Sequence, residues 1–94
     1  MNKLSAELIN ERLKNYTSWN FSGNMLSKEF ILKDFKSVLD FVNKIGEAAE
    51  QLNHHPDMFI HSWNKLKVSV TTHSEGGVTE KDFTLIDRIE KHQH

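Results

Sequence analysis

The feature that most constrains the fold is a long apolar repeat in the middle of the chain. Asp34 is a good N-cap for a helix. Asn53 and Pro56 mark its end, because a helix rarely continues into the residue before a proline. In between, apolar residues recur at helical spacing, at Phe35, Val38, Leu39, Val42, Ile45, Ala49 and Leu52. The repeat predicts a long helix with one apolar side.

The segments before this helix predict a short helix and a hairpin. Ser5 is a good N-cap, and we predict a helix over residues 6–15. Residues 18–32 contain two extended runs with the dipeptide Gly23-Asn24 between them, which is a typical hairpin turn.

The segments after the long helix predict a second strand pair and a last helix. We expect strands over residues 58–63 and 66–73. In the second of these, alternation places Thr72 on the apolar side and His73 on the polar side, at the strand end. Thr79 is expected to cap the last helix, whose inner face would be Phe83, Ile86 and Ile89.

The predicted order is therefore α-β-β-α-β-β-α. Strands joined as hairpins form an antiparallel sheet, and helices with one apolar side each cover one face of it. We predict an α+β, two-layer domain with a four-stranded antiparallel sheet and three helices on one face. The length of 94 residues favours one domain over residues 1–94, with the last few residues frayed.

Composition excludes several classes of protein. The formal net charge is −1, whereas general nucleic-acid binders carry a basic excess and anionic membranes attract basic proteins. The sequence has no cysteine, which excludes disulfides, thiolate nucleophiles and cysteine-bound zinc. It shows no signal peptide and no apolar run long enough to cross a bilayer, so the cytoplasm is the expected location.

Three histidines occur at predicted ends of elements, where side chains can converge. His54 and His55 follow the long helix, and His73 ends a strand. Imidazole can donate or accept a proton near neutral pH, which suits acid–base catalysis. Histidines at helix ends are also common surface residues, because the helix dipole favours a cation there. Both readings stay open on spacing alone.

The other histidines fit other roles. His61 shares a predicted strand face with Phe59 and Trp63 and is expected to be a half-buried sheet residue. His92 and His94 could bind a metal weakly, but a frayed tail is the simpler reading. The chain lacks HExxH and a histidine pair at i, i+4, so we predict no metal site.

Two acidic residues could support these imidazoles. Glu50 lies one helical turn before His54, either as a surface pair or as a carboxylate that tunes a catalytic imidazole. Asp82 is the third residue after Thr79 and could complete a capping box, or it could orient an imidazole. We expect that it cannot do both well, and the cap is the favoured reading.

The spacing of these residues resembles the signature of the pterin-4a-carbinolamine dehydratases. It consists of Glu50, three residues, His54-His55-Pro56, six residues, Trp63, nine residues, His73, then eight residues to Asp82. The resemblance covers roughly residues 30–89. It implies the same α+β fold and the dehydration of 4a-hydroxytetrahydropterin to quinonoid dihydropterin, in recycling of the pterin of aromatic amino acid hydroxylases. It implies no metal and no bound cofactor.

The resemblance also implies roles for individual residues. The catalytic histidines would be His54, His55 and His73, with His54 and His73 nearest the reacting atoms and His55 orienting the pterin. Substrate contacts would run through His54, His55, Pro56, Thr72, His73, Ser74 and Glu75. Supporting residues would be Glu50, Trp63 and Asp82, the last beside His73. Which imidazole is acid and which is base stays open.

Met58 stands where a tryptophan is common in the family, which would loosen one wall of the pocket. The family implies a homodimer or homotetramer. A non-catalytic alternative is a dimerisation or coactivator module for a protein partner, or an accessory factor in another pterin pathway.

Overall fold

The computed structural model describes residues 3–93 and contains the predicted elements in the predicted order. The elements are α1 (Ala6–Arg12), η1 (Leu13–Asn15), β1 (Asn20–Ser22), β2 (Met25–Ile31), α2 (Phe35–Leu52), β3 (Asp57–His61), β4 (Lys65–Val70), η2 (His73–Glu75) and α3 (Glu80–His92). The predicted fold class is therefore confirmed.

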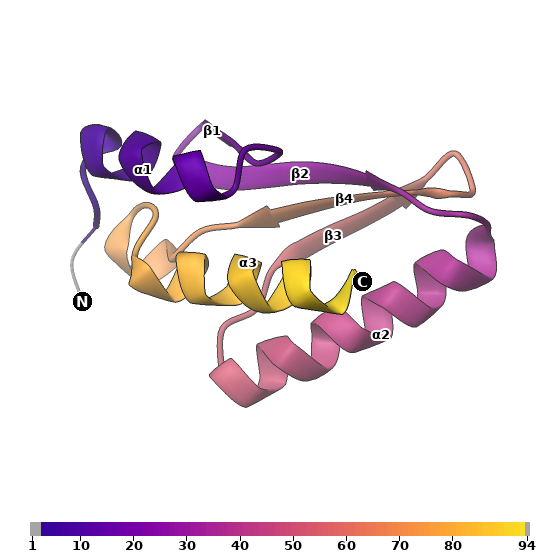
Figure 1. Ribbon diagram of the computed structural model, residues 1–94. Helices are drawn as coiled ribbons and strands as arrows, with labels where there is room; N and C mark the ends of the chain where they lie inside the picture. The colour runs from indigo at the N-terminus through magenta and orange to yellow at the C-terminus, as the bar shows by residue number, and fades with distance from the viewer. Residues whose placement is uncertain (1–2, 94) are drawn as a thin grey trace.

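The four strands form one antiparallel sheet in the order β1-β2-β4-β3 (Figure 1). Leu26 on β2 pairs with Val70 on β4, and Phe30 pairs with Leu66. This register places the apolar residues of both central strands on one face, where they are buried. Gly23 and Asn24 have φ values of 60° and 62°, as a tight hairpin turn between β1 and β2 requires.

Helices α2 and α3 lie against the apolar face of the sheet, and α1 lies beside β1 (Figure 1). The core joins the buried residues of the sheet to those of the helices, including Ile9 of α1, Ile45 of α2 and Ile86 of α3. The predicted caps are present: Ser5, Asp34 and Thr79 each accept a hydrogen bond from a backbone N–H of the helix that follows. No helix within residues 3–93 is long and apolar enough to cross a membrane.

The hairpin between β3 and β4 differs from the prediction. We expected a strand to continue to Trp63, but β3 ends at His61. Ser62 and Trp63 have φ values of 50° and 55°, in the left-handed region, so the chain already turns at these positions. Trp63 therefore lies in a turn and is 63% exposed.

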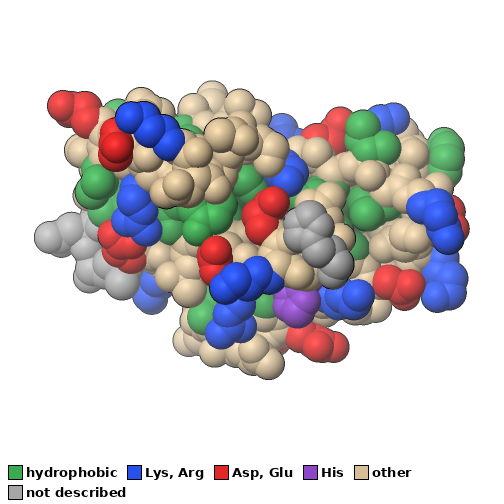
Figure 2. Space-filling view, viewed as in Figure 1, with side chains coloured by type: hydrophobic (Ala, Val, Ile, Leu, Met, Phe, Trp, Pro, Cys, Tyr) green, Lys and Arg blue, Asp and Glu red, His purple; other side chains and the backbone are tan. Residues whose placement is uncertain are grey.

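Helix α2 is apolar over more of its surface than one buried face needs. Val38, Phe41 and Ile45 are buried in the core, whereas Phe35 and Leu39 are 48% and 41% exposed. The sequence prediction did not include Phe41. It placed Phe35 and Leu39 on the same apolar side as Val38 and Ile45, and that was wrong for Phe35 and Leu39. Figure 2 shows hydrophobic side chains on the surface at the end of the molecule where β2 passes into α2.

The single tyrosine, Tyr16, directly follows η1 and contacts α3. Tyr16 packs against Phe83 with ring centroids 6.1 Å apart, and its hydroxyl donates a 3.1 Å hydrogen bond to Asp87. Burial, followed by the bond to the Asp87 carboxylate, raises the pKa of Tyr16 above its ordinary value.

We predict that the phenol of Tyr16 ionises at higher pH in the folded protein than in urea. The raised pKa means that the contact contributes stability that is present below about pH 10, where an unfolded tyrosine ionises. This stability is lost as pH rises through the folded-state pKa. Absorbance titration of the phenolate measures both values cleanly, because the chain has one tyrosine. Equal pKa values in the two states would contradict the contact with Asp87.

Candidate functional site

The end of α2 determines where the two adjacent histidines lie. Asn53 adopts the left-handed conformation with φ 51°, and its N–H is bonded to the carbonyls of Ala49 and Glu50. The N–H of His54 also bonds back to the carbonyl of Ala49 at 3.0 Å. These bonds satisfy the last carbonyls of the helix and turn the chain away from its axis. His54 is therefore outside the helix.

This turn changes the partner expected for Glu50. On a continuous helix Glu50 would face His54, but the left-handed residue between them breaks that relation. Glu50 instead accepts a 2.5 Å hydrogen bond from Nε2 of His55. Both side chains are largely exposed, so this pair is a weak surface contact.

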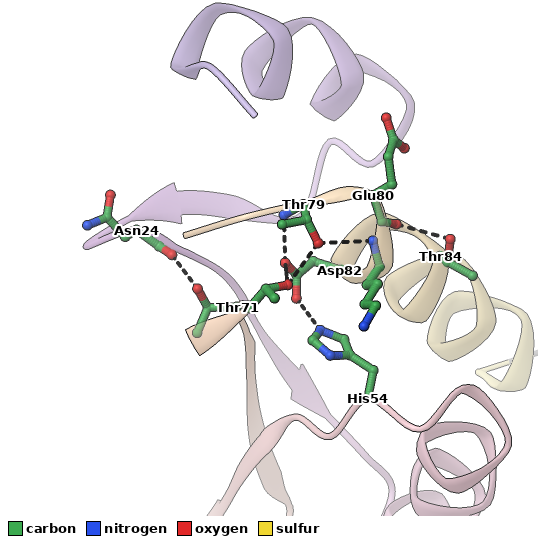
Figure 3. A network of polar contacts seen from close by, with 9 residues as sticks. Asn24, His54, Thr71, Thr79, Glu80, Asp82 and Thr84 are labelled. Carbon is green, nitrogen blue, oxygen red and sulfur yellow. Dashed lines mark hydrogen bonds and ion pairs between the residues drawn. The ribbon is translucent and has the colours of Figure 1, made fainter. Parts of the chain in front are cut away.

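His54 is bonded to a buried carboxylate. Its Nε2 donates to Asp82 Oδ1 at 2.6 Å, and the two side chains are 11% and 0% exposed. Figure 3 shows His54 reaching from the end of α2 toward the first turn of α3, where Asp82 lies. The prediction that Asp82 supports His73 is not what the structure shows, since its imidazole partner is His54.

The second oxygen of Asp82 holds the start of α3. Oδ2 accepts the backbone N–H of Thr79 at 2.8 Å and the hydroxyl of Thr72 at 2.9 Å. Thr79 and Asp82 form the predicted capping box. We expected Asp82 to serve either the cap or an imidazole, and that was wrong. A carboxylate has two oxygens, and here each oxygen serves one of the two roles.

The segment after β4 places His73. The strand ends at Val70, and Thr72 makes an isolated antiparallel bridge with Gly77. Between them His73 begins the one-turn helix η2, which ends at Gly76 in the left-handed conformation. The prediction that the strand continues to His73 was wrong, although Thr72 does face the core as its parity required.

The three histidines border one open cleft with a volume of about 310 Å³. This volume is at the lower end of the range for small-molecule sites, roughly 300–1,000 Å³. The cleft is lined by Asn53, His54, His55, Thr71, Thr72, His73, Ser74 and Lys81. The sequence analysis did not select Asn53, Thr71 or Lys81, although the position of Asn53 as the predicted helix stop could have indicated it.

A larger groove of about 690 Å³ runs beside α2. Val42 and Gly46 line this groove, and His55 lines both the groove and the histidine cleft. Pro56 and Met58 also line this groove rather than the histidine cleft, so Met58 is not a wall of that cleft. We take the smaller cleft as the candidate site, because it adjoins all three histidines, whereas the larger groove adjoins His55 without His54 or His73.

Two other residues that the sequence analysis predicted for the site, Trp63 and Glu75, do not line the cleft. Trp63 follows β3 whereas His55 precedes it, so they lie at opposite ends of that strand. Glu75 belongs to η2 but is not among the residues that line the cleft. His61 stacks on Phe59 with ring centroids 5.3 Å apart and pairs with Glu29, as a partly buried sheet residue.

The structure offers no metal centre in the part of the chain that it describes. No group of three or more histidine, aspartate or glutamate side chains within residues 3–93 is arranged to hold a metal ion. His92 is the last residue of α3, and His94 lies outside the described residues.

The fold and the cleft define a class: a two-layer α+β protein with histidines gathered at the exit of its central helix. The sequence profile of the family described as "Pterin 4 alpha carbinolamine dehydratase" matches residues 2–92. The chain belongs to this family.

Individual relatives agree with this assignment. Proteins of Sulfurisphaera tokodaii and Sulfolobus acidocaldarius that carry the same dehydratase name are 40% and 42% identical over 97% of this chain, and the matches cover 97% and 99% of those proteins. A solved structure from Brucella melitensis, titled a transcriptional coactivator/pterin dehydratase, matches with TM-score 0.90 and 32% identity, covering 96% of this chain and 97% of that one.

A more distant structure shares the fold alone. It is described as a pterin dehydratase-like RuBisCO assembly factor of the alpha-carboxysome, with TM-score 0.66 and 17% identity, and the match covers 79% of this chain and 87% of that one.

We predict that Thr79→Ala lowers the free energy of unfolding by about 1–3 kcal/mol, because it removes a helix cap and leaves a buried hydroxyl without its donor. The bonds concerned are those of Thr79 Oγ1 to Lys81 N and to Thr72. The matched control is Thr84→Ala, since the exposed Thr84 hydroxyl bonds only a helical carbonyl. Urea denaturation measures both. Equal losses in the two variants would contradict the importance of the buried network.

Proposed function

We propose that this protein dehydrates a 4a-hydroxytetrahydropterin to quinonoid dihydropterin and water. The observation that carries the proposal is the convergence of His54, His55 and His73 on one cleft, with His54 bonded to a buried carboxylate. Membership of the dehydratase family supports the same reaction.

The reaction needs two proton transfers and no redox change. One imidazole removes the proton from N5, and the electron pair of the N–H bond forms the N5–C4a double bond. The C4a–O bond breaks, and a second imidazole protonates the departing oxygen to give water. We propose His54 and His73 for these transfers, with no metal or bound cofactor, since the pterin is the substrate.

The remaining cleft residues would bind the pterin ring. We propose that His55 orients it and that backbone groups along Thr72, His73 and Ser74 bond its amide-like edge. Pro56 and Glu75 stay candidate substrate contacts, and Glu50 acts through His55. Trp63 would support the fold of the hairpin rather than the pterin.

We predict that the double variant His54→Ala, His73→Ala loses at least about 10²-fold in kcat, because general acid–base groups contribute roughly 10²–10⁴-fold. The measurement is the loss of carbinolamine absorbance with synthetic 4a-hydroxytetrahydropterin. His61→Ala is the matched control, since His61 pairs with Glu29 on the sheet. Full activity in the double variant would disprove the assigned site.

We also propose that the protein is a homodimer or homotetramer. Phe35, Leu39, Val42 and Gly46 recur at spacings of four, three and four residues on the outer side of α2. Such spacing is typical of helices that pack on another helix. Packing within one chain does not account for the exposed side chains of this row, Phe35 and Leu39.

Leu39→Gln is predicted to lower the molecular mass in solution by removing this apolar contact. Light scattering over a range of concentrations measures it. The control is Lys44→Gln, which places the same new side chain at an exposed position of the same helix. If both variants keep the wild-type mass, the outer side of α2 is not the contact between copies.

A protein-binding role is the second candidate. Ile31, Phe59 and Trp63 are each more than 60% exposed, and none of them belongs to the core of one chain. The Brucella structure is titled both coactivator and dehydratase. A specific captured partner together with no dehydratase rate would favour this role. In either role we expect a cytoplasmic protein without direct nucleic-acid or membrane binding.

A further inference from the structure

We propose that Lys81 makes the histidine cleft selective for pterins whose substituent at C6 carries an anionic group, either a carboxylate or a phosphate. The inference rests on the proposed dehydration and names the class of pterin that the site takes. It depends on the charges of the groups that line the cleft, on the position of Lys81 in the first turn of α3, and on the geometry of the pterin ring.

The residues that line the cleft include a lysine but no acid. Of the eight lining residues, one is Lys81, three are histidines, and the others carry an amide or a hydroxyl group. The whole chain has a formal net charge of −1, so this arrangement is a local one. A cleft lined by one sign of charge raises the local concentration of ligands of the opposite sign. We therefore expect the cleft to prefer an anion to a neutral ligand of similar shape.

The acidic residues that directly adjoin the lining residues in sequence do not face the cleft as free charges. Asp82 is fully buried and is bonded inside the protein. Glu80 pairs with Arg12 at 2.8 Å, and the hydrogen bond from Arg12 lowers the pKa of Glu80. Glu75 is exposed in η2 but does not line the cleft. No ion pair among residues 3–93 involves Lys81, so its ammonium group is available to a ligand.

The cap of α3 determines how Lys81 can bind a ligand. The hydroxyl of Thr79 accepts the backbone N–H of Lys81 at 3.2 Å, so this N–H is already occupied. The side chain of Lys81 is exposed and lines the cleft. An anion there would be held by the ammonium group rather than by the start of the helix. The next residue, Asp82, bonds His54, so the same turn of α3 adjoins the proposed reacting groups.

The geometry of the pterin ring places its substituent beside the reacting atoms. The proposed reaction removes a proton from N5 and breaks the bond from C4a to oxygen. N5 is bonded to both C4a and C6, so a C6 substituent starts one bond away from the atom that loses the proton. The ring itself carries no formal charge at neutral pH, so an anionic group must belong to the substituent. A pterin that meets the imidazoles at N5 and C4a therefore extends its substituent within the cleft that Lys81 lines.

Two neutral groups of the cleft add to the binding of an anion. Asn53 and Ser74 are exposed and line the cleft together with Lys81. An amide NH₂ and a hydroxyl can both donate hydrogen bonds to oxygen. Carboxylates and phosphates present several acceptor oxygens, and lysine binds either of them as a point charge. The chemistry that the cleft recognises is therefore an oxyanion on the substituent.

The decisive variant is Lys81→Gln, which removes the charge and keeps a long polar side chain. Lys81→Arg keeps the charge. The matched control is Lys91→Gln, which removes the same charge from the same helix. Lys91 pairs with Asp87 and lies ten residues after Lys81. Ten residues are about 15 Å along a helix, and the Debye length at 0.1 M salt is about 10 Å. Lys81 and Lys91 are both exposed, so we expect every variant to fold.

The first readout is kcat/KM with three synthetic 4a-hydroxytetrahydropterins. Their C6 substituents are hydroxymethyl, the phosphate ester of hydroxymethyl, and carboxymethyl. We expect wild type to prefer an anionic substrate to the neutral one by about 3–10-fold, through KM, since the contact lies between an exposed ion pair and a charge-assisted hydrogen bond. Lys81→Gln is expected to lose the preference, whereas Lys81→Arg and Lys91→Gln keep it. A preference for only one of the two anions supports the inference and identifies the group.

The second readout is binding, which needs no turnover. Pterin fluorescence measures Kd for the stable oxidised pterins with the same three substituents. We expect the anionic pterins to bind wild type more tightly by a similar factor, and Lys81→Gln to bind all three equally. The advantage is expected to vanish in about 1 M salt, where the Debye length is about 3 Å. The Kd of the hydroxymethyl pterin is expected to change little with salt.

The outcomes separate this inference from the proposed function. Dehydration of all three substrates with equal kcat/KM overturns the inference and leaves the proposed function intact. A preference that persists in Lys81→Gln, or that Lys91→Gln loses to the same extent, overturns it as well, because Lys81 is then not its cause. Absence of dehydration with all three substrates overturns the proposed function. The binding titration then still decides whether Lys81 selects anionic pterins.

Discussion

The buried carboxylate of Asp82 is the group on which both the fold of this region and the candidate site depend. One oxygen closes the capping box with Thr79 and accepts the hydroxyl of Thr72, and the other holds His54. A charge with no exposed surface is stable only when such donors surround it. The start of α3, the end of β4 and the exit of α2 are therefore joined at one point. Any change in this carboxylate affects packing and imidazole orientation together.

The second constraint is the way α2 ends. A left-handed Asn53 stops the helix, and the two adjacent histidines that follow it have different partners. His54 turns inward to Asp82, whereas His55 turns outward to Glu50 and borders a second groove. Side chains of consecutive residues commonly diverge, and here the divergence gives one imidazole a buried partner and the other an exposed one. This asymmetry is what allows different roles for chemically identical groups.

Much of the fold could be predicted from the sequence because short local patterns, such as helix caps and turn residues, specify it. The caps at Ser5, Asp34 and Thr79 and the hairpin turn at Gly23-Asn24 are where their residue types predict them. Predictions failed where one residue changes the backbone direction. Left-handed residues at Ser62 and Trp63 end β3 early. Strand β4 ends at Val70, before Thr72 forms its bridge with Gly77 and His73 begins η2. The outer apolar side of α2 was missed since helical spacing does not say which side faces the core.

The sequence by itself determined the order of the helices and strands, the family, and which three histidines are candidates for the site. Helix caps, apolar periodicity and the spacing of motif residues can all be recognised along the chain without knowing its fold. Only the tertiary structure decided which carboxylate each imidazole meets. Asp82 lies 28 residues after His54, and sequence separation of that size carries no information on side-chain distance. The partner was set by two helix ends meeting beside one strand end, where burial requires that every donor and acceptor be paired.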